Sequence, residues 1–268
     1  MSKLLSIVVL NWNRLHYTRQ TIECLLKKTT VPHELILVDN NSTDESGIRN
    51  YLNQVSGNTN TKEIKLIFNN KNLGVAGGRN SGLSKATGDY LMTIDDDILV
   101  PDNYDIHFSK ICDNIPKLGI TGVNVEPIKY EVKEMNGIRF RPKNGNLGGA
   151  CLCIPRRVFN TIGYYNYFST YGHEDAAMYY RLSTIGLISA YIEPRGVHLD
   201  NDSLIEYRAA KNKAHAKGSP QLSALSSYLK EMRATKNVYV PFNPDFNPAD
   251  MKIFTNELIS NDYKMRKK

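Results

Sequence analysis

Three consecutive carboxylates, Asp95, Asp96 and Asp97, directly follow the apolar segment from Tyr90 to Ile94. Carboxylates this close repel one another, and proteins tolerate that cost mainly where a cation or a donor-rich ligand neutralises the charge. The triplet therefore predicts a divalent-metal site at the end of a strand. The alternative is a solvated acidic turn that caps a helix beginning near Pro101.

Two further segments carry groups suited to a nucleotide. Asp39 ends an apolar strand and precedes a polar turn, so its carboxylate is placed either to accept a hydrogen bond from a base or to cap that turn. The segment from Asn72 to Leu83 is glycine-rich, which lets the backbone approach a ligand, and its Arg79 suits bidentate contact with phosphate. It has neither the ending of a Walker loop nor the Gly-X-Gly-X-X-Gly spacing, which disfavours a dinucleotide-dependent oxidoreductase.

An acidic pair and a late histidine complete the candidate chemistry. Glu174 and Asp175 open an expected helix, where the helix dipole alone also favours acidic residues. His198 follows the strand-like segment from Ser189 to Glu193. A neutral imidazole combined with carboxylates suits manganese, although a lone histidine is more often a packed or surface residue.

The elements that must position these residues begin with a repeating βαβ pattern. Apolar runs predict strands at 4–10, 34–38, 65–68 and 90–94, and helical patterns occupy 17–27 and 76–86. Such a pattern predicts a parallel nucleotide-binding sheet, in which ligands bind at the carboxyl ends of the strands. The polar residues that follow each strand are therefore expected to share one site.

After Asp97 the pattern changes to a helix at 104–115 and short strands at 119–125 and 149–154, with loops at 136–149. A mixed extension of the sheet is expected there. Residues 204–234 predict two helices, and the proline-containing stretch 241–248 predicts an extended segment over the body. The predicted fold class is α/β, with a Rossmann-like, mostly parallel sheet, a mixed extension and C-terminal helices.

Composition limits the remaining possibilities. Of the 268 residues, 41% are hydrophobic and 23% charged, which is typical of soluble globular proteins, and no apolar run approaches the length of a membrane span. The N-terminal apolar run favours a buried strand over a signal peptide. Four cysteines without zinc spacing are expected to be reduced core residues of a cytosolic protein. The net charge of +7 favours an anionic partner, and the basic tail 264–268 indicates a solvated end or a membrane contact.

Taken together, three segments closely resemble the inverting GT-A glycosyltransferase family, particularly its rhamnosyltransferase-like bacterial members. They are SIVVLNWNR at 6–14, VDNNSTDES at 38–46 and NKNLGVAGGRNSGLSKATGDYLMTIDDDI at 70–98, and the resemblance covers roughly residues 4 to 200. It implies a GT-A fold, with a catalytic domain at 1–203 (nucleotide-binding half 1–100, acceptor half 101–203) and a helical appendage and tail at 204–268. The implied reaction is Mn²⁺- or Mg²⁺-dependent transfer from a nucleoside-diphosphate sugar, expected to be a UDP-sugar, to an acceptor hydroxyl with inversion.

The resemblance also implies roles for individual residues. Trp12 stands where the family usually has Tyr after Pro-Thr, and it is expected to contact the nucleobase. The residues implied at the nucleotide are Asn11, Trp12, Asn13, Asp39 at the base, Arg79 at the base or diphosphate, Asp95 at the ribose, and Asp96. The residues implied at the metal are Asp97 and His198. On the acceptor side, the resemblance implies Asp175 as general base, Glu174 at acceptor hydroxyls and His173 in the lining of the pocket. The glycine-rich segment 144–149 is expected to form a lid or a pocket wall.

Three other functions stay open at this level: a retaining GT-A transferase, a sugar nucleotidyltransferase, and a catalytically silent sugar-binding or assembly protein. The acidic triplet, the Glu-Asp pair and the late histidine disfavour the silent protein. The expected partners are a nucleotide-sugar donor and an acceptor that is a glycan, a lipid-linked sugar, a protein or a nucleic acid. A cytoplasmic location, with peripheral contact at the inner face of the membrane, fits the basic composition.

Overall fold

The structure, a computed structural model, describes residues 3–127, 130–168, 172–199, 216 and 219–247. The strands are β1 (Leu5–Asn11), β2 (His33–Asp39), β3 (Thr61–Phe68), β4 (Tyr90–Asp95), β5 (Ile98–Leu99), β6 (Leu118–Gly122), β7 (Lys133–Met135), β8 (Ile138–Lys143), β9 (Cys151–Pro155), β10 (Ile188–Ile192) and β11 (Val197–His198). The helices are α1 (Leu15–Lys28), the 3-10 turn η1 (Asp44–Ser46), α2 (Ile48–Leu52), α3 (Gly74–Leu83), α4 (Tyr104–Asn114), α5 (Arg156–Ile162), α6 (Glu174–Thr184) and α8 (Pro220–Thr235).

Among the described residues, nine strands form one sheet in the order β3-β2-β1-β4-β9-β6-β10-β8-β7. The first four in this order are parallel, as the βαβ pattern predicted. Within them Asn11 pairs with Asp39, and Leu10 pairs with Asp95. The carboxyl ends of β1, β2 and β4 therefore meet at one edge, and the polar segments that follow them start from neighbouring points.

Beyond β4 the sheet is mixed. Strand β9 runs antiparallel to both β4 and β6, whereas β10 runs parallel to β6. The expectation of loops throughout 136–149 is wrong, because β8 pairs with β10 and forms a hairpin with β7. The turn is Asn136-Gly137, with both residues at positive φ, and this dipeptide is a strong hairpin signal. Phe140 of β8 is buried against the sheet.

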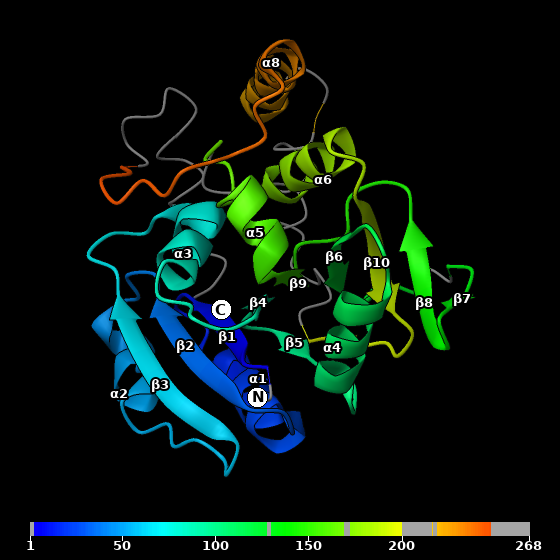
Figure 1. Cartoon of the computed structure of the whole chain (residues 1–268). Helices are drawn as coiled ribbons and strands as arrows, with labels where there is room; N and C mark the ends of the chain where they lie inside the picture. The colour runs from blue at the N-terminus through cyan, green and yellow to red at the C-terminus, as the bar shows by residue number, and fades with distance from the viewer. Residues whose placement is uncertain (1–2, 128–129, 169–171, 200–215, 217–218, 248–268) are drawn as a thin grey trace.

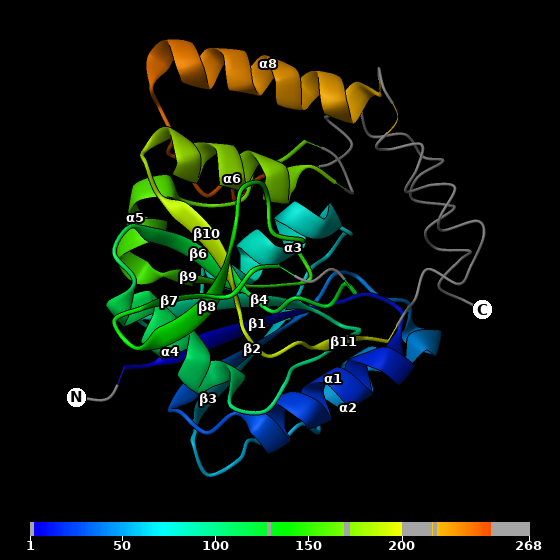
Figure 2. The ribbon, with the colours of Figure 1, turned by 90° about the vertical axis from the view of Figure 1, so that its right-hand side faces the viewer.

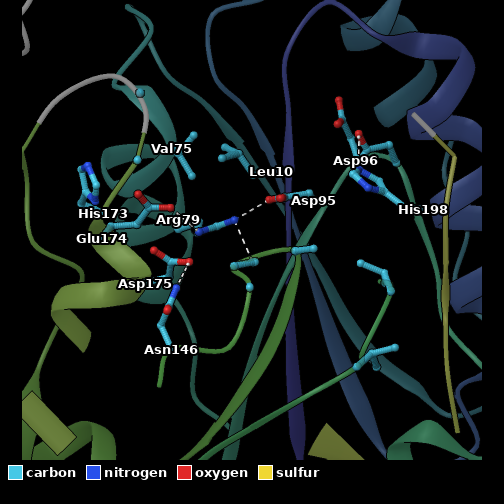
Figure 3. Close-up of a pocket in the computed structure, with 18 of the residues that line it drawn as sticks. Leu10, Val75, Arg79, Asp95, Asp96, Asn146, His173, Glu174, Asp175 and His198 are labelled. Atoms are coloured by element: carbon cyan, nitrogen blue, oxygen red, sulfur yellow. Dashed lines mark hydrogen bonds and ion pairs between the residues drawn. The ribbon is translucent and has the colours of Figure 1, made fainter. Parts of the chain in front are cut away.

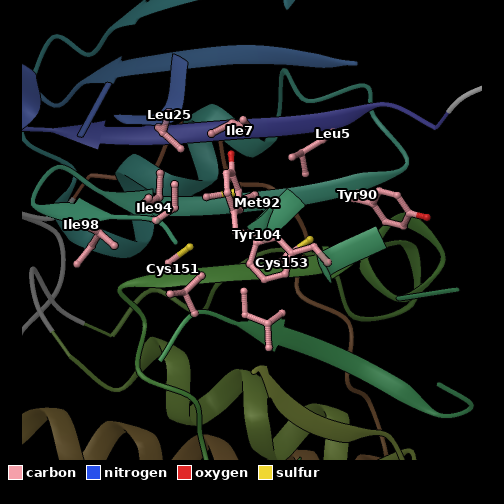
Figure 4. Close-up of a cluster of buried hydrophobic side chains, with 14 of the residues drawn as sticks. Leu5, Ile7, Leu25, Tyr90, Met92, Ile94, Ile98, Tyr104, Cys151 and Cys153 are labelled. Atoms are coloured by element: carbon pink, nitrogen blue, oxygen red, sulfur yellow. The ribbon is translucent and has the colours of Figure 1, made fainter. Parts of the chain in front are cut away.

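Helices cover both faces of the sheet, with α1, α2 and α4 on one face and α3, α5 and α6 on the other (Figures 1 and 2). The side chains of β1 alternate between them: Ile7 and Val9 join the core under α1 and α4, and Val8 joins the core under α3 and α5. Figure 4 shows the first of these cores. Because both faces are covered, β1 is a continuous apolar run rather than an alternating one.

The four cysteines are free thiols, as expected from their spacing. Cys151 and Cys153 of β9 are buried on the same face of the sheet, within the core shown in Figure 4. Burial raises the pKa of both thiols, so they remain protonated. They behave as small apolar side chains of the core.

The C-terminal part of the described chain packs on the body. Helix α8 lies against α6 (Figure 2), and Ser219 caps it by accepting a hydrogen bond from the Leu222 amide at 3.2 Å. The following segment returns to the body, where the Tyr164 amide donates to the Val240 carbonyl at 2.9 Å. A Cβ at Gly163 would lie 2.0 Å from that same carbonyl oxygen, so only glycine permits this approach.

Residues 241–247 contain no helix or strand, and Phe246 packs on Tyr167 of the body, but the chain turns at Pro244-Asp245, so the predicted segment is not extended throughout. The first of the two helices predicted within 204–234 lies outside the described residues. In the part of the chain that the structure describes, no helix is long and apolar enough to cross a membrane.

Candidate active site

Asp97 and His198 are brought together by a short two-stranded sheet. Strand β4 ends at Asp95, the chain turns through Asp97, and β5 then pairs with β11, so that Ile98 lies opposite His198. The Leu199 amide donates to the Asp97 carbonyl at 2.8 Å, which ties the two segments together. As a result the Asp97 carboxylate lies 3.4 Å from the His198 Nε2 atom, across 101 residues of sequence (198 − 97).

Arg14 holds the same carboxylates from another direction. Its guanidinium forms an ion pair with Asp96 and a second one with Asp97 Oδ2 at 2.7 Å. Burial alone would raise the pKa of Asp97, but the hydrogen bond with His198 and the charge of Arg14 outweigh it and lower that pKa to about 2. Asp97 is therefore a carboxylate throughout the physiological pH range.

The chemistry of this cluster fits a divalent cation. Asp97 Oδ1 is buried and accepts no hydrogen bond, which leaves a carboxylate oxygen without compensation. Carboxylate oxygen and imidazole nitrogen are suitable ligands for Mn²⁺ or Mg²⁺. No group of three or more His, Cys, Asp or Glu side chains among the described residues is arranged to hold a metal. Such a cation would need further oxygen ligands from phosphates or water, as is common for Mg²⁺.

Arg79 links the acidic triplet to the start of α6. This guanidinium, only 2% exposed, donates to Asp95 at 2.6 Å and to Glu174 at 3.0 Å. It also donates to the Gly149 carbonyl at 2.9 Å. A Cβ at Gly149 would lie 3.0 Å from the Arg79 Nη1 atom, so the close approach favours glycine there. Figure 3 shows Arg79 between Asp95 and Glu174.

The acidic pair lies at the first turn of α6. Asp175 Oδ1 accepts the amide of Ala176 at 2.7 Å, and its Oδ2 accepts a hydrogen bond from Asn146 at 3.0 Å. Both oxygens are thus oriented by donors. Burial, together with the charge of Asp175, raises the pKa of Glu174 to about 7, and Arg79 limits that rise. The Glu174 carboxyl group is therefore partly protonated near neutral pH.

These residues share one cavity of about 450 Å³. The predicted site residues that line it are Trp12, Arg79, Asp95, Asp96, Asp97, His173, Glu174, Asp175 and His198. In Figure 3, Asp95, Asp96 and His198 stand on one side of the cavity, and His173, Glu174 and Asp175 stand on the other. Gly148 and Gly149 also line it, so the segment 144–149 contributes a wall. Closure of that segment as a lid stays a prediction.

Asn11, Asn13 and Asp39 do not line this cavity. Asn11 is fully buried, and its amide donates to the carbonyls of Val9 and Val38, which ties β1 to β2. Asn13 accepts the Thr43 amide at 2.8 Å. Asn11 and Asn13 therefore form local hydrogen bonds within the fold, and their contact with a nucleotide stays a prediction.

The bonds of Asp39 match the turn-capping alternative. Its Oδ1 accepts the Ser42 amide at 2.9 Å, and its Oδ2 accepts Arg49 Nε at the same distance. These bonds leave a role at the base untested.

Several cavity residues were assigned no role from the sequence. Arg14, Lys143, Asn146 and Tyr191 all line the cavity. Arg14 follows the Asn-Trp-Asn segment directly, and a cation beside a predicted ligand-binding turn was the one hint available. Lys143 lies against Tyr191, with its ammonium 5.5 Å from the ring centroid, and this contact depends on the pairing of β8 with β10.

The arrangement of strands and helices is that of the GT-A glycosyltransferases. The chain resembles the crystal structure of GalNAc-T7 with UDP, GalNAc and Mn²⁺ with a TM-score of 0.62 and 17% identity, over 88% of this chain and 55% of that one. It resembles the mannosyltransferase PcManGT from Pyrobaculum calidifontis in complex with GDP-Man and Mn²⁺ with a TM-score of 0.58 and 14% identity, over 100% and 81%. At such identities the likeness shows the fold alone.

Sequence comparison identifies the family. The model of glycosyl transferase family 2 matches residues 6–153, more than half of the chain, and the chain belongs to this family. It is 34% identical over 103 residues to glycosyltransferase GlyG of Streptococcus pneumoniae serotype 4, covering 38% of this chain and 33% of that protein. It is 29% identical over 136 residues to the uncharacterized glycosyltransferase YwdF of Bacillus subtilis, covering 51% and 46%. The matches therefore span a third to a half of these relatives, and the family resemblance seen in the motifs is confirmed.

Proposed function

We propose that the protein is a metal-dependent glycosyltransferase that moves a sugar from a nucleoside-diphosphate sugar to an acceptor hydroxyl with inversion. The observation that carries this proposal is that Asp97, His198 and Asp175 line one cavity. Figure 3 shows His198 and Asp175 on opposite sides of it. The two similar structures contain UDP or GDP-Man together with Mn²⁺. We expect a UDP-sugar donor here.

On the donor side, Asp97 and His198 would hold Mn²⁺ or Mg²⁺, which supplies Lewis-acid neutralisation of the charge on the departing diphosphate. Trp12, 7% exposed, offers an aromatic surface in the cavity for the base. Asp95 is held in place by Arg79 and, being 32% exposed, presents acceptor oxygens for ribose hydroxyls. The paired strands β1 and β4 provide the edge from which Trp12, Asp95 and Asp97 project.

On the acceptor side, Asp175 is the general base. Its carboxylate accepts the proton of the acceptor hydroxyl while that oxygen forms a bond to the anomeric carbon and the bond from that carbon to the phosphate oxygen breaks. The electron pair of the broken bond leaves with the nucleoside diphosphate, and a single displacement inverts the anomeric centre. Asn146 and the Ala176 amide orient the base. Glu174 and His173 border the acceptor pocket, with Glu174 positioned by Arg79.

The test is the substitution Asp175→Asn, which keeps shape but removes the base. Release of nucleoside diphosphate from a panel of nucleotide sugars and acceptors should fall roughly 10²- to 10⁴-fold, the usual contribution of a positioned general base. Thermal stabilisation by the nucleotide with Mn²⁺ should be unchanged, because the donor site is intact. Asp113→Asn is the matched control, since Asp113 forms an ion pair with Lys3, away from the cavity.

An active Asp175→Asn variant would remove Asp175 from this role. Retention of the anomeric configuration in the product, read by NMR, would replace inversion by retention. Release of pyrophosphate would instead indicate a nucleotidyltransferase. No turnover of any donor, with binding intact, would favour a sugar-binding protein.

A further inference from the structure

We propose that Arg14 is an internal cation that competes with the divalent metal for Asp97, so that the metal binds tightly only when a nucleoside diphosphate enters with it. This inference rests on the proposed function and concerns the regulation of the same site. It assigns to Arg14 a positioning role that the family motifs did not indicate.

The first observation is that one oxygen is shared. Asp97 Oδ2 lies 2.7 Å from the Arg14 Nη2 atom and 3.4 Å from the His198 Nε2 atom. A cation held between Asp97 and His198 would therefore stand next to the guanidinium. Like charges this close repel strongly in a partly buried site. Arg14 thus both stabilises the Asp97 carboxylate and opposes the arrival of a second cation.

The second observation is the charge of the cluster. Asp96 and Asp97 contribute two negative charges and Arg14 one positive charge, which leaves a net charge of about −1. A divalent ion would change this to about +1 while Arg14 stays in place. A nucleoside diphosphate brings further negative charge and restores the balance. Metal and diphosphate are therefore expected to bind with strong positive coupling, and thermodynamic linkage makes that coupling reciprocal.

The third observation is that Arg14 is placed to change partners. It lies at the N-cap position of α1, in the loop that follows β1, and its side chain is 13% exposed at the cavity. A guanidinium binds phosphate in a bidentate manner as well as it binds carboxylate. When the diphosphate is bound, Arg14 turns from Asp97 toward a phosphate oxygen, which frees Asp97 Oδ2 for the cation.

The experiment measures Mn²⁺ binding directly by the EPR signal of the free ion, using the chain of residues 1–268. Wild type is compared with Arg14→Met and Arg14→Gln, each without nucleotide and with UDP or GDP. Without nucleotide, both variants should bind Mn²⁺ at least about tenfold more tightly than wild type. The nucleotide that binds should strengthen Mn²⁺ binding of the wild type more than that of the variants, because the variants have less repulsion to relieve.

Two controls locate the effect. Arg139→Met removes an exposed arginine paired with Glu193 and should leave Mn²⁺ affinity unchanged. Asp97→Asn in the Arg14→Met background should abolish the gain, since the gain belongs to the Asp97 site. Arg14→Lys keeps a cation and should stay within about threefold of wild type, and it provides a folded comparison if either neutral variant is unstable.

Equal Mn²⁺ affinity in wild type and the neutral Arg14 variants overturns the competition. A gain that survives Asp97→Asn overturns it too. If these results appear while Asp175→Asn still abolishes transfer, the proposed transferase stands and only the role of Arg14 fails. Absence of Mn²⁺ binding in every protein, with or without nucleotide, overturns the metal requirement as well as this inference.

Discussion

Two arginines in one cavity hold two carboxylates each, yet they differ in origin and accessibility. Arg79 projects from α3 and is 2% exposed, and its partners Asp95 and Glu174 belong to opposite walls. Arg14 comes from a loop, and its partners Asp96 and Asp97 are neighbours in sequence. Arg79 therefore joins two halves of the fold, whereas Arg14 balances charge within one turn. Arg79 thus connects the walls of the site, and Arg14 is the residue that we propose regulates its occupancy.

The largest effect on stability is expected from Arg79→Met. The substitution leaves the carboxylates of Asp95 and Glu174 without their counter-ion and the Gly149 carbonyl without its donor. Breaking a buried ion pair by removing one partner costs about 3–5 kcal/mol. Urea unfolding should show a loss of that size. A loss below about 1 kcal/mol would mean that Arg79 does not join the two walls.

Arg14→Met should cost less, about 1–2 kcal/mol, because the Arg14 side chain is 13% exposed and that of Arg79 only 2%, so water can replace the lost guanidinium more readily. Urea unfolding should be repeated with Mn²⁺ present. The cation should restore stability to this variant and should not do so for Arg79→Met. If Mn²⁺ restored stability equally in both variants, the two arginines would not differ in their relation to the metal site.

The stability of the protein should depend on pH through Glu174, which is paired with Arg79. Its pKa is raised from 4.5 to about 7 in the folded protein, so between these values the folded state binds a proton that the unfolded chain has lost. The unfolding free energy contributed by this group therefore falls as pH rises through that window. In urea titrations, the decrease in unfolding free energy between pH 5 and pH 7 should be smaller by about 1 kcal/mol in Glu174→Gln than in the wild type. An unchanged slope would show that Glu174 titrates normally.

The smallest effect on stability is expected from Arg139→Met, which serves as the reference for the other two arginine substitutions. Arg139 pairs with Glu193 at 2.9 Å, but its side chain is 58% exposed. Exposed ion pairs contribute between nothing and about 1 kcal/mol, so Arg139→Met should shift the unfolding free energy by less than about 0.5 kcal/mol. A shift as large as that of Arg14→Met would show that burial does not explain the ranking.

Much of the parallel half could be predicted from local patterns. Runs of β-branched and aliphatic residues mark β1 and β2, and the carboxyl end of a strand is where ligands bind in such sheets. The acidic triplet was predicted because it comes at the end of a strand, and the Glu174–Asp175 pair because it opens a helix and resembles the acidic pair of the family. Asn136-Gly137 also indicates the hairpin of β7 and β8, but the strands on either side of it are short and polar, so the sequence pattern did not predict them.

The sequence by itself determined where β1, β2 and β4 end and where α6 begins, because those boundaries depend on neighbours along the chain. Only the tertiary structure decided the partners of the long charged side chains. Asp97 meets Arg14 from 83 residues away (97 − 14), and Glu174 meets Arg79 from 95 residues away (174 − 79). It also turned Asn11 inward to the carbonyls of β1 and β2. A flexible guanidinium pairs with whichever carboxylate the fold brings near, and no local pattern encodes that distance.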